Sequence, residues 1–293
     1  MKIVITGASG RIGRAIYAEL MKNYKVVGVD LIPSSTADYV GDIRDPLFVG
    51  KALTGADVVV HAAALHAPHV GLFSDAEFEN INVRASEELV IQAIKGGVKH
   101  VVFTSTTALY GHASTPAGMA GWIDETVEPQ PKTIYHRTKI DAEKSFRHLS
   151  NRFDFPITVL QVSRCFPEPA DLMAVYRYTR GIDARDVATA HRRAIEKRLA
   201  GFNRFIVSGS TPFDPSCCEQ LFTSAPTLFA EFLPDLVCAF EERGWSLPKS
   251  LDRVYDSSSA QQVLNWRPVF HADSVLESLD NGLADVLPVQ DSG

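Results

Sequence analysis

The chain opens with Lys2-Ile-Val-Ile-Thr-Gly7-Ala-Ser-Gly10-Arg-Ile-Gly13, a short apolar run that leads into a glycine-rich turn. Gly7 permits the tight turn, Gly10 lets backbone N–H groups approach a diphosphate, and Gly13 lets a helix pack closely on the strand. Unpaired N–H groups at the start of that helix favour a bound anion. The stretch predicts a site for the diphosphate of a dinucleotide. Its expected contacts are Gly7, Gly10, Arg11, Ile12 and Gly13.

Short apolar runs and amphipathic stretches alternate through the first half of the chain. The runs are nearly continuous in apolar residues, as in parallel strands covered on both faces. The stretches Ile12–Lys22 and Phe78–Lys95 have the spacing of helices packed on a sheet. The expected strands are Ile3–Thr6, Val26–Asp30, Val58–Ala62, Val101–Ser105 and Thr158–Val162. This alternation predicts an α/β fold with a doubly wound parallel sheet of the Rossmann type.

The second half is less regular, and prolines punctuate it from a composition shift near Arg164 onward. We expect residues 1–163 to form a dinucleotide-binding Rossmann domain, with residues 182–203 returning to it. Residues 164–293 are expected to form a smaller substrate-binding cap. One further strand is expected at Arg204–Val207.

Composition and charge exclude several classes of protein. The 293 residues carry a formal net charge of -6, whereas nucleic-acid binding requires a clustered basic surface. The apolar runs are far too short to span a bilayer, and because the first strand begins at Lys2 we expect no secretory leader. We expect a cytoplasmic protein with a small-molecule substrate and neither a nucleic-acid nor a membrane partner.

The four cysteines show no CxxC pair and no accompanying histidine spacing. This pattern indicates neither a metal site nor a disulfide framework. Cys165 lies close to the expected substrate region, where we interpret it as a buried thiol without a chemical role.

Asp30 ends the second expected strand, where a carboxylate can accept hydrogen bonds from ribose hydroxyls. It would also repel a 2′-phosphate, and Leu31 and Ile32 provide no cation to offset that repulsion. These residues predict NAD rather than NADP as the cofactor. Asp42 and Ile43 stand at the expected end of the third strand, where Asp42 either accepts from the adenine amino group or is a solvated turn residue.

Tyr135 and Lys139 are four residues apart and therefore share one face of a helix. A phenol with a pKa near 10 is a poor base at neutral pH, but a neighbouring ammonium and a positive nicotinamide ring both favour the phenolate. Thr106, directly after an expected strand, can hydrogen-bond the same substrate oxygen. The three residues predict proton exchange by Tyr135 during hydride transfer.

These motifs together resemble the extended short-chain dehydrogenases/reductases of the NAD-dependent epimerase/dehydratase family. The resembling blocks run through almost the whole chain. They are Gly7–Gly13, Asp30, Gly41–Ile43, His61–Ala64, Asn82-Val83, Phe103–Gly111, Tyr135–Lys139, Asp183–Val187, Tyr255–Ala260 and Leu264–Pro268.

The resemblance implies a role for particular positions. Thr106 and Tyr135 match the catalytic Ser/Thr and Tyr, and Lys139 matches the lysine that holds the nicotinamide ribose and lowers the Tyr pKa. Asn82 is expected to brace the backbone. Relatives commonly dimerise through helices that correspond here to Phe78–Lys95 and Tyr135–Leu149, so a homodimer is expected. Backbone contacts to the cofactor are expected from Ala62, Ala63 and Ala64.

The same resemblance narrows the reaction. Family dehydratases carry an Asp-Glu pair after the catalytic Thr and decarboxylases carry a Glu, whereas this chain has Thr107 and Ala108. Dehydration and decarboxylation are therefore disfavoured, and Thr107 becomes a candidate substrate contact. The run Cys165–Pro169 after Arg164 is similar to uronate dehydrogenases, which hold a sugar carboxylate with an arginine. Arg164 and Arg177 are candidates for substrate binding, and the alternative for Arg177 is an exposed side chain.

The favoured function is NAD-dependent oxidation of a hydroxyl of a sugar or sugar acid, with Tyr135 as acid and base. The alternative is a nucleotide-sugar (UDP-hexose) 4-epimerase. A distant alternative is a non-catalytic protein that senses NAD, although Tyr135 and Lys139 are both intact. His66, His69 and His112 follow strand ends, and we interpret them as solvated loop residues rather than substrate ligands.

Overall fold

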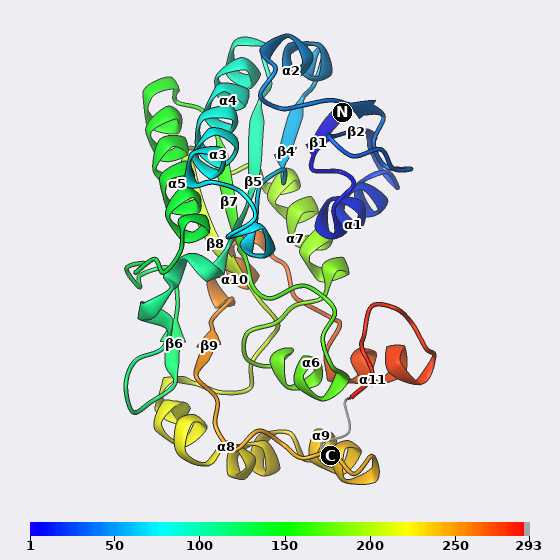
Figure 1. The fold of residues 1–293 in the computed structure, drawn as a ribbon, viewed down its shortest axis with the longest axis vertical. Coiled ribbons are helices and arrows are strands. Elements are labelled where there is room, and N and C mark those ends of the chain that lie inside the picture. Colours follow the sequence, from blue (N-terminus) through cyan, green and yellow to red (C-terminus); the bar gives the residue numbers. More distant parts are fainter. Residues whose placement is uncertain (290–293) are drawn as a thin grey trace.

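Seven parallel strands form one sheet in the computed structural model, which describes residues 1–289 (Figure 1). Their order across the sheet is β3 (Tyr39–Val40), β2 (Lys25–Asp30), β1 (Lys2–Thr6), β4 (Val58–His61), β5 (His100–Thr106), β7 (Ile157–Val162) and β8 (Phe202–Val207). Every residue of β4 and of β7 is buried, as the continuous apolar runs predict. The predicted doubly wound parallel sheet is confirmed.

Helices cover both faces of this sheet and enclose a separate apolar core on each. The helices on one face are α1 (Arg11–Leu20), α7 (Ala184–Lys197) and α10 (Ser258–Leu264), and those on the other are α2 (Pro46–Leu53), α4 (Ser86–Lys95) and α5 (Ile134–Phe153). Alternate strand residues point to opposite cores: Val60 packs with Ile16 of α1, and Val59 packs in the core that contains Phe146 of α5. Burial on both sides fixes the register of the strands.

The direction of strand addition reverses between β1 and β4. β2 and β3 lie on one side of β1, and the remaining strands lie on the other. Thr6, the last residue of β1, is in register with His61, the last residue of β4. Ligands of open α/β sheets bind outside the carboxyl ends of the strands at such a reversal. The glycine turn and the segment after His61 both start there.

The predicted helix Phe78–Lys95 is interrupted. It consists of α3 (Asp75–Glu79), a π-helical turn (Asn80–Ala85) and α4. Asn82 lies in the π turn, where its side chain accepts from the N–H of Leu65 at 2.8 Å and donates to the carbonyl of Leu65 at 2.9 Å. The prediction that Asn82 braces the backbone is therefore confirmed. The extra residue of a π turn changes which way a helical side chain points.

A second layer lies beneath the carboxyl edge of the sheet (Figure 1). Its core joins helices with a parallel pair of short strands, and Phe229 and Phe240 are fully or almost fully buried in it. Its elements are β6 (Gly121–Ile123), α6 (Ala170–Tyr176), α8 (Cys218–Phe232), α9 (Pro234–Glu242), β9 (Arg253–Tyr255) and α11 (Ala272–Asp280). Because β6 precedes Arg164 while α7 and β8 follow it, the chain passes between sheet and cap more than once.

Several features agree with the sequence in kind and differ in extent. β8 begins at Phe202, two residues before the expected strand, and β4 ends at His61 rather than at Ala62. All four cysteines, each within the described residues, are free thiols, and Cys165 is buried as predicted.

Between residues 1 and 289, no helix is long and apolar enough to cross a bilayer. Across the same span, no group of three or more His, Cys, Asp or Glu side chains is arranged to hold a metal ion.

Candidate active site

The glycine turn after β1 is packed so closely at Gly7 that a side chain is excluded there. Gly7 has a φ of 74°, and a Cβ atom on it would lie 2.6 Å from the backbone nitrogen of Ala63. Gly10 caps the N-terminus of α1, and no side-chain cap is present there among the described residues. The first N–H groups of α1 therefore remain available for an anion. This geometry fits the diphosphate of a dinucleotide.

Arg11 and Ile12 contribute in different ways to this turn. Ile12 packs against the core of the α1 face, so its backbone is the part that can face a ligand. The guanidinium of Arg11 instead pairs with Asp285 at 2.5 Å, and the Asp285 side chain is 67% exposed. An exposed ion pair of this kind is weak, so the Arg11 guanidinium can exchange Asp285 for a phosphate. Sequence reasoning missed Asp285 because it lies 274 residues from Arg11.

The segment after β4 closes the other side of the turn. Ala62 donates its N–H to the carbonyl of Thr6 at 3.1 Å, and Ala63 donates to the Thr6 hydroxyl at 3.3 Å. Ala62, Ala63 and Ala64 are all half-buried. The backbone of Ala62 and Ala63, predicted to contact the cofactor, thus lies against Gly7.

Asp30 lies at the carboxyl end of β2, beside the glycine turn. Its two carboxylate oxygens accept from the N–H of Ser9 at 2.9 Å and from the N–H of Ile32 at 2.8 Å. Each oxygen retains a lone pair for a further donor such as a ribose hydroxyl. The negative charge is therefore fixed next to the turn, where the sequence predicts it.

Asp42 and Ile43 follow β3. The Arg44 guanidinium binds both oxygens of Asp42 and lowers the pKa of that carboxyl below its usual range. The Asp42 side chain is 29% exposed, and Ile43 packs against the core of the α2 face. Contact of Asp42 with an adenine stays a prediction.

Thr106 and Tyr135 come together at the carboxyl end of β5. Thr106 accepts from the N–H of Ala108 at 3.1 Å, which starts the short 3-10 helix Thr107–Tyr110. Tyr135 lies in the first turn of α5 and packs in a cluster with Leu65 and Phe78. Burial raises the pKa of Tyr135 to about 12, and a side-chain hydrogen bond with Thr106 counteracts part of that rise. The protein alone thus keeps this phenol protonated.

Lys139 follows Tyr135 by one turn of α5 and is 2% exposed. Its ammonium donates to the carbonyl of Thr104 at 2.8 Å and lies 4.0 Å from the centre of the Phe103 ring. Burial lowers the pKa of Lys139 to about 7, while the charge of Glu143 raises it. In this structure the ammonium of Lys139 is thus bonded to the backbone of β5 and not to the phenol of Tyr135.

The candidate substrate residues Thr107 and Arg164 differ in their exposure to solvent. Thr107 is buried, and its carbonyl accepts a long hydrogen bond from the Tyr255 hydroxyl at 3.4 Å. Arg164 follows β7 at the catalytic edge; its side chain is 42% exposed and pairs with Glu168 at 2.5 Å. The Arg164 guanidinium also lies over the Phe166 ring at 4.4 Å. The guanidinium of Arg164 therefore reaches solvent at this edge, where a substrate could contact it.

Arg177 is buried rather than exposed, so the exposed alternative is wrong. Its side chain is 3% exposed and binds Asp183 at 2.9 Å. Asp183 also accepts from Arg185, and it caps the N-terminus of α7. A guanidinium held in this way is positioned as a structural brace between α6 and α7.

The loop after β4 carries two of the three candidate histidines. His66 and His69 stack with ring centres 4.3 Å apart, and His66 is exposed. Partial burial of the ring, then the charges of His69 and Lys139, lower the pKa of His66. His112 is exposed on a separate short 3-10 helix. Contact of any of them with substrate stays untested by this geometry.

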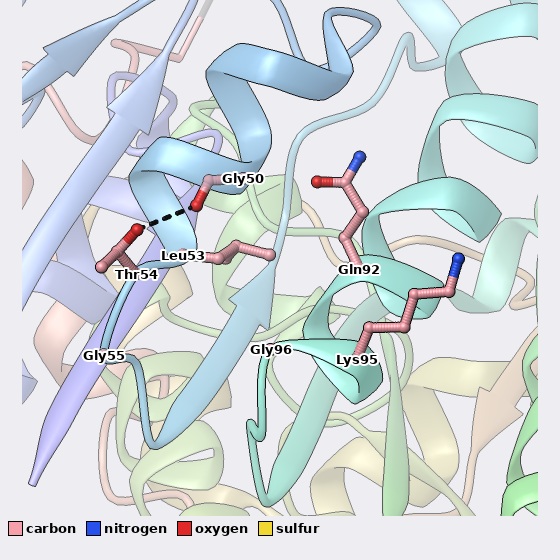
Figure 2. A pocket seen from close by; sticks show the side chains of 7 residues that line it. All are labelled: Gly50, Leu53, Thr54, Gly55, Gln92, Lys95 and Gly96. Atoms are coloured by element: carbon pink, nitrogen blue, oxygen red, sulfur yellow. Dashed lines mark hydrogen bonds between the residues drawn. The ribbon is translucent and has the colours of Figure 1, made fainter.

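A hollow of about 450 Å³ lies elsewhere, between the C-terminal ends of α2 and α4 (Figure 2). Its lining residues are Gly50, Leu53, Thr54, Gly55, Gln92, Lys95 and Gly96. The end of α2 precedes β4 and so lies at the amino edge of the sheet, opposite Thr106. The only hydrogen bond drawn in Figure 2 ties Thr54 to the carbonyl of Gly50 at 3.1 Å. This hollow therefore lies apart from the candidate active site.

One buried acid near the site escaped the sequence analysis. Glu143 lies one turn after Lys139 on the same face of α5 and is 6% exposed. The four-residue spacing from Lys139 was a usable signal, because it repeats the spacing between Tyr135 and Lys139.

Comparison of the sequence with known proteins finds a family model and individual relatives. A model of the NAD dependent epimerase/dehydratase family matches residues 3–169. The N-acetyl-alpha-D-glucosaminyl-diphospho-ditrans,octacis-undecaprenol 4-epimerase of Escherichia coli O157:H7 is 29% identical over 51% of this chain and 44% of its own length. This chain therefore matches less than half the length of that relative. The UDP-glucose 4-epimerase of Corynebacterium glutamicum is 25% identical over 92% of this chain and 91% of its own length.

Solved structures share the fold. A short-chain dehydrogenase/reductase superfamily protein from Agrobacterium tumefaciens with bound NAD has a TM-score of 0.72 at 19% identity, covering 96% of each chain. The UDP-glucose 4-epimerase of Thermotoga maritima with UDP-glucose has a TM-score of 0.70 at 20% identity, covering 96% of this chain and 99% of its own. At these identities the likeness concerns the arrangement of strands and helices.

Proposed function

The chain belongs to the NAD dependent epimerase/dehydratase family, and on this basis we propose that it acts on a hydroxyl carbon of a nucleotide sugar. The family membership confirms the predicted enzyme class and the predicted cofactor, NAD. Among reactions of this kind we favour 4-epimerisation of a UDP-hexose. The sequence alone favoured a sugar or sugar-acid dehydrogenase, which becomes the second candidate.

The observation that carries the proposal is the pairing of Tyr135 with Thr106 at the carboxyl edge of β5. Both hydroxyls lie next to the strand-order reversal where a dinucleotide would bind. Tyr135 takes the proton of the substrate hydroxyl and later returns it, while Thr106 hydrogen-bonds the same oxygen. Bound NAD supplies a ring that accepts and gives back the hydride.

Lys139 completes this arrangement through its ammonium group. When the ammonium binds the ribose, its charge comes closer to the phenol and favours the phenolate. The same charge offsets the burial that raises the pKa of Tyr135 to about 12. Lys139 thus both holds the cofactor and tunes the base.

Two observations support the nucleotide-sugar substrate. A relative that matches over nearly its whole length is named as a UDP-glucose 4-epimerase. In addition, Arg177 is buried and paired with Asp183, an arrangement that fits a structural brace better than a ligand for the carboxylate of a sugar acid. The second candidate depends instead on Arg164, whose exposed guanidinium lies at the carboxyl end of β7.

The two candidates differ in what happens to the cofactor. An epimerase converts UDP-galactose to UDP-glucose without net formation of NADH, which proton NMR of the sugar and absorbance of NADH measure together. We expect conversion of the nucleotide sugar and constant NADH absorbance. Accumulation of NADH on a free uronic acid, with no turnover of UDP-hexoses, would contradict the epimerase and establish the second candidate.

We also propose that the protein is a homodimer. α4 and α5 lie side by side on one face of the sheet, and in a dimer they would pair with the same helices of a second copy (Figure 1). Sedimentation at micromolar concentration should give twice the chain mass, and a monomer would contradict this arrangement.

A further inference from the structure

Lys139 places a positive charge in a poorly solvated site. The Thr104 carbonyl and the Phe103 ring both favour a cation, but neither carries a net negative charge. Burial lowers the pKa of Lys139 to about 7, so the ammonium form is only partly populated at neutral pH. The pKa would be lower still without a nearby carboxylate, whose charge raises it.

Glu143 supplies that charge from the same face of α5. Its carboxylate accepts from the Ser105 hydroxyl at 2.5 Å and from the Gln161 amide nitrogen, which lies 3.0 Å from both oxygens. The guanidinium of Arg204 lies 3.8 Å away. These three contacts are donors or cations, and they therefore stabilise the ionised carboxylate. Burial acts in the other direction and raises the pKa of Glu143.

The orientation of these donors is itself fixed. Tyr110, whose side chain is fully buried, donates to the amide oxygen of Gln161 at 2.8 Å. This bond turns the Gln161 amide nitrogen toward Glu143, because the reversed amide would face its oxygen to the carboxylate. Arg204 is held by donation to the carbonyl of Glu125 at 2.6 Å. Side chains from β5, β7 and β8 thus converge on one carboxylate of α5.

We propose that Glu143 is a positioning residue, whose buried carboxylate keeps the ammonium of Lys139 charged and in place for the cofactor ribose. The use of that ammonium rests on the proposed function. The electrostatic coupling between Glu143 and Lys139 does not rest on the proposed function. An experiment can therefore refute this proposal without refuting the proposed function, and the reverse.

Groups on the other elements do not replace this carboxylate. From β4, the ring of His61 is bonded to Thr6 and Ser86, and burial with the Lys139 charge holds its pKa at about 3, so it is neutral. From the loop after β4, His66 is neutral or positive. On α5 itself, Tyr135 is kept protonated by burial. Loss of the Glu143 charge should therefore lower the pKa of Lys139.

A direct test follows the titration of Lys139 by carbon-13 NMR in the full chain. The Lys139 signal is assigned by its loss in Lys139→Met. Nearby opposite charges typically shift a pKa by about 1–3 units, and Glu143 lies one helical turn from Lys139, so Glu143→Gln should lower the Lys139 midpoint by about one unit. Ser105→Ala is the matched control, because it removes a hydrogen bond to Glu143 and keeps the charge. An unchanged midpoint in Glu143→Gln would overturn the proposal.

The consequence for the cofactor is a pH-dependent loss of affinity. With a midpoint lowered by about one unit from about 7, Glu143→Gln should bind NAD about twofold more weakly than wild type at pH 6 and about tenfold more weakly at pH 8. Calorimetry measures both values. A loss of equal size at both pH values indicates a merely structural role and contradicts the proposal.

The wild-type protein provides a test if Glu143→Gln does not fold. The carboxyl carbon of Glu143 should show the chemical shift of an ionised group at pH 7, and a protonated group would overturn the proposal. A wild-type protein that binds no NAD at any pH would instead overturn the proposed function and leave the Lys139 titration interpretable.

Discussion

A Cβ atom on Gly13 would lie 2.0 Å from the carbonyl oxygen of Gly7. The two glycines therefore pack the first turn of α1 directly on the loop that leaves β1. Neither partner of this contact can move easily, because Gly7 is itself pressed against the backbone of Ala63. The contact sets how close the N-terminus of α1 comes to a bound diphosphate.

Gly13→Ala should accordingly destabilise the protein and weaken NAD binding. Overpacking of a close contact typically costs about 1–3 kcal/mol, which thermal or denaturant unfolding measures. Gly50→Ala is the matched control, because a Cβ there lies 3.4 Å from the nearest atom, the side-chain oxygen of Gln92. In a helix that control should be neutral or stabilising by up to about 1 kcal/mol. Equal stability of the two variants would contradict the packing argument.

Asp30→Asn should reduce the preference for NAD over NADP. The change removes the charge that repels a 2′-phosphate, and it keeps an oxygen that can accept from Ser9 or Ile32. We expect wild type to bind NADP poorly and the variant to narrow the gap by weakening NAD and strengthening NADP. Calorimetry with both cofactors measures the ratio. Equal affinity of the wild-type protein for both would show that Asp30 does not face the ribose.

Tyr135→Phe should lower turnover with little change in NAD affinity. Acid–base assistance is typically worth about 10²–10⁴-fold, and phenylalanine preserves the packing against Leu65 and Phe78. Thr106→Val should cost less, because it deletes one hydrogen bond and leaves the base. Steady-state rates on a verified substrate measure both. Near-full activity of Tyr135→Phe would move the search for the base to His66 and the other histidines at the strand ends.

NAD affinity of the wild-type protein should decrease as pH rises through about 7. The Lys139 pKa in the cofactor-free protein is lowered to about 7, so the lysine is charged below that pH and progressively neutral above it. Only the charged form donates a full ammonium to the ribose. Lys139→Met should bind NAD more weakly, without this dependence, in calorimetry between pH 6 and 9. A wild-type affinity that is constant over this range would contradict the assignment.

The local parts of the fold were predictable from sequence. Nearly continuous apolar runs identified the inner strands, because strands buried on both faces need apolar side chains at most positions. The glycine turn was predictable because Gly7, Gly10 and Gly13 stand at a recognisable spacing directly after the first strand, although the closest contacts of Gly7 are with the distant Ala62 and Ala63. Tyr135 and Lys139 were recognisable from their spacing on one helix.

Features that depend on distant partners were not predictable. β6 pairs with β9, where Gly121 is in register with Arg253, more than a hundred residues later. Asn82 of the π turn bonds to the distant Leu65, and no periodicity in residues 80–85 reveals those bonds. Arg177 presents the same problem, since a lone arginine gives no sign of whether its partner is solvent, substrate or a buried acid.

Arg177 allows a last test, which separates a brace from a substrate ligand. If Arg177 is a brace, Arg177→Met leaves Asp183 without a buried cation and should destabilise the protein by about 3–5 kcal/mol. Arg185→Met is the matched control: Arg185 pairs with the same carboxylate, but its side chain is 54% exposed, so its loss should cost about 1 kcal/mol or less. Unfolding by denaturant measures both. If Arg177→Met were as stable as wild type and raised the KM only for substrates with a carboxylate, the brace would be refuted and a sugar acid would become the better substrate.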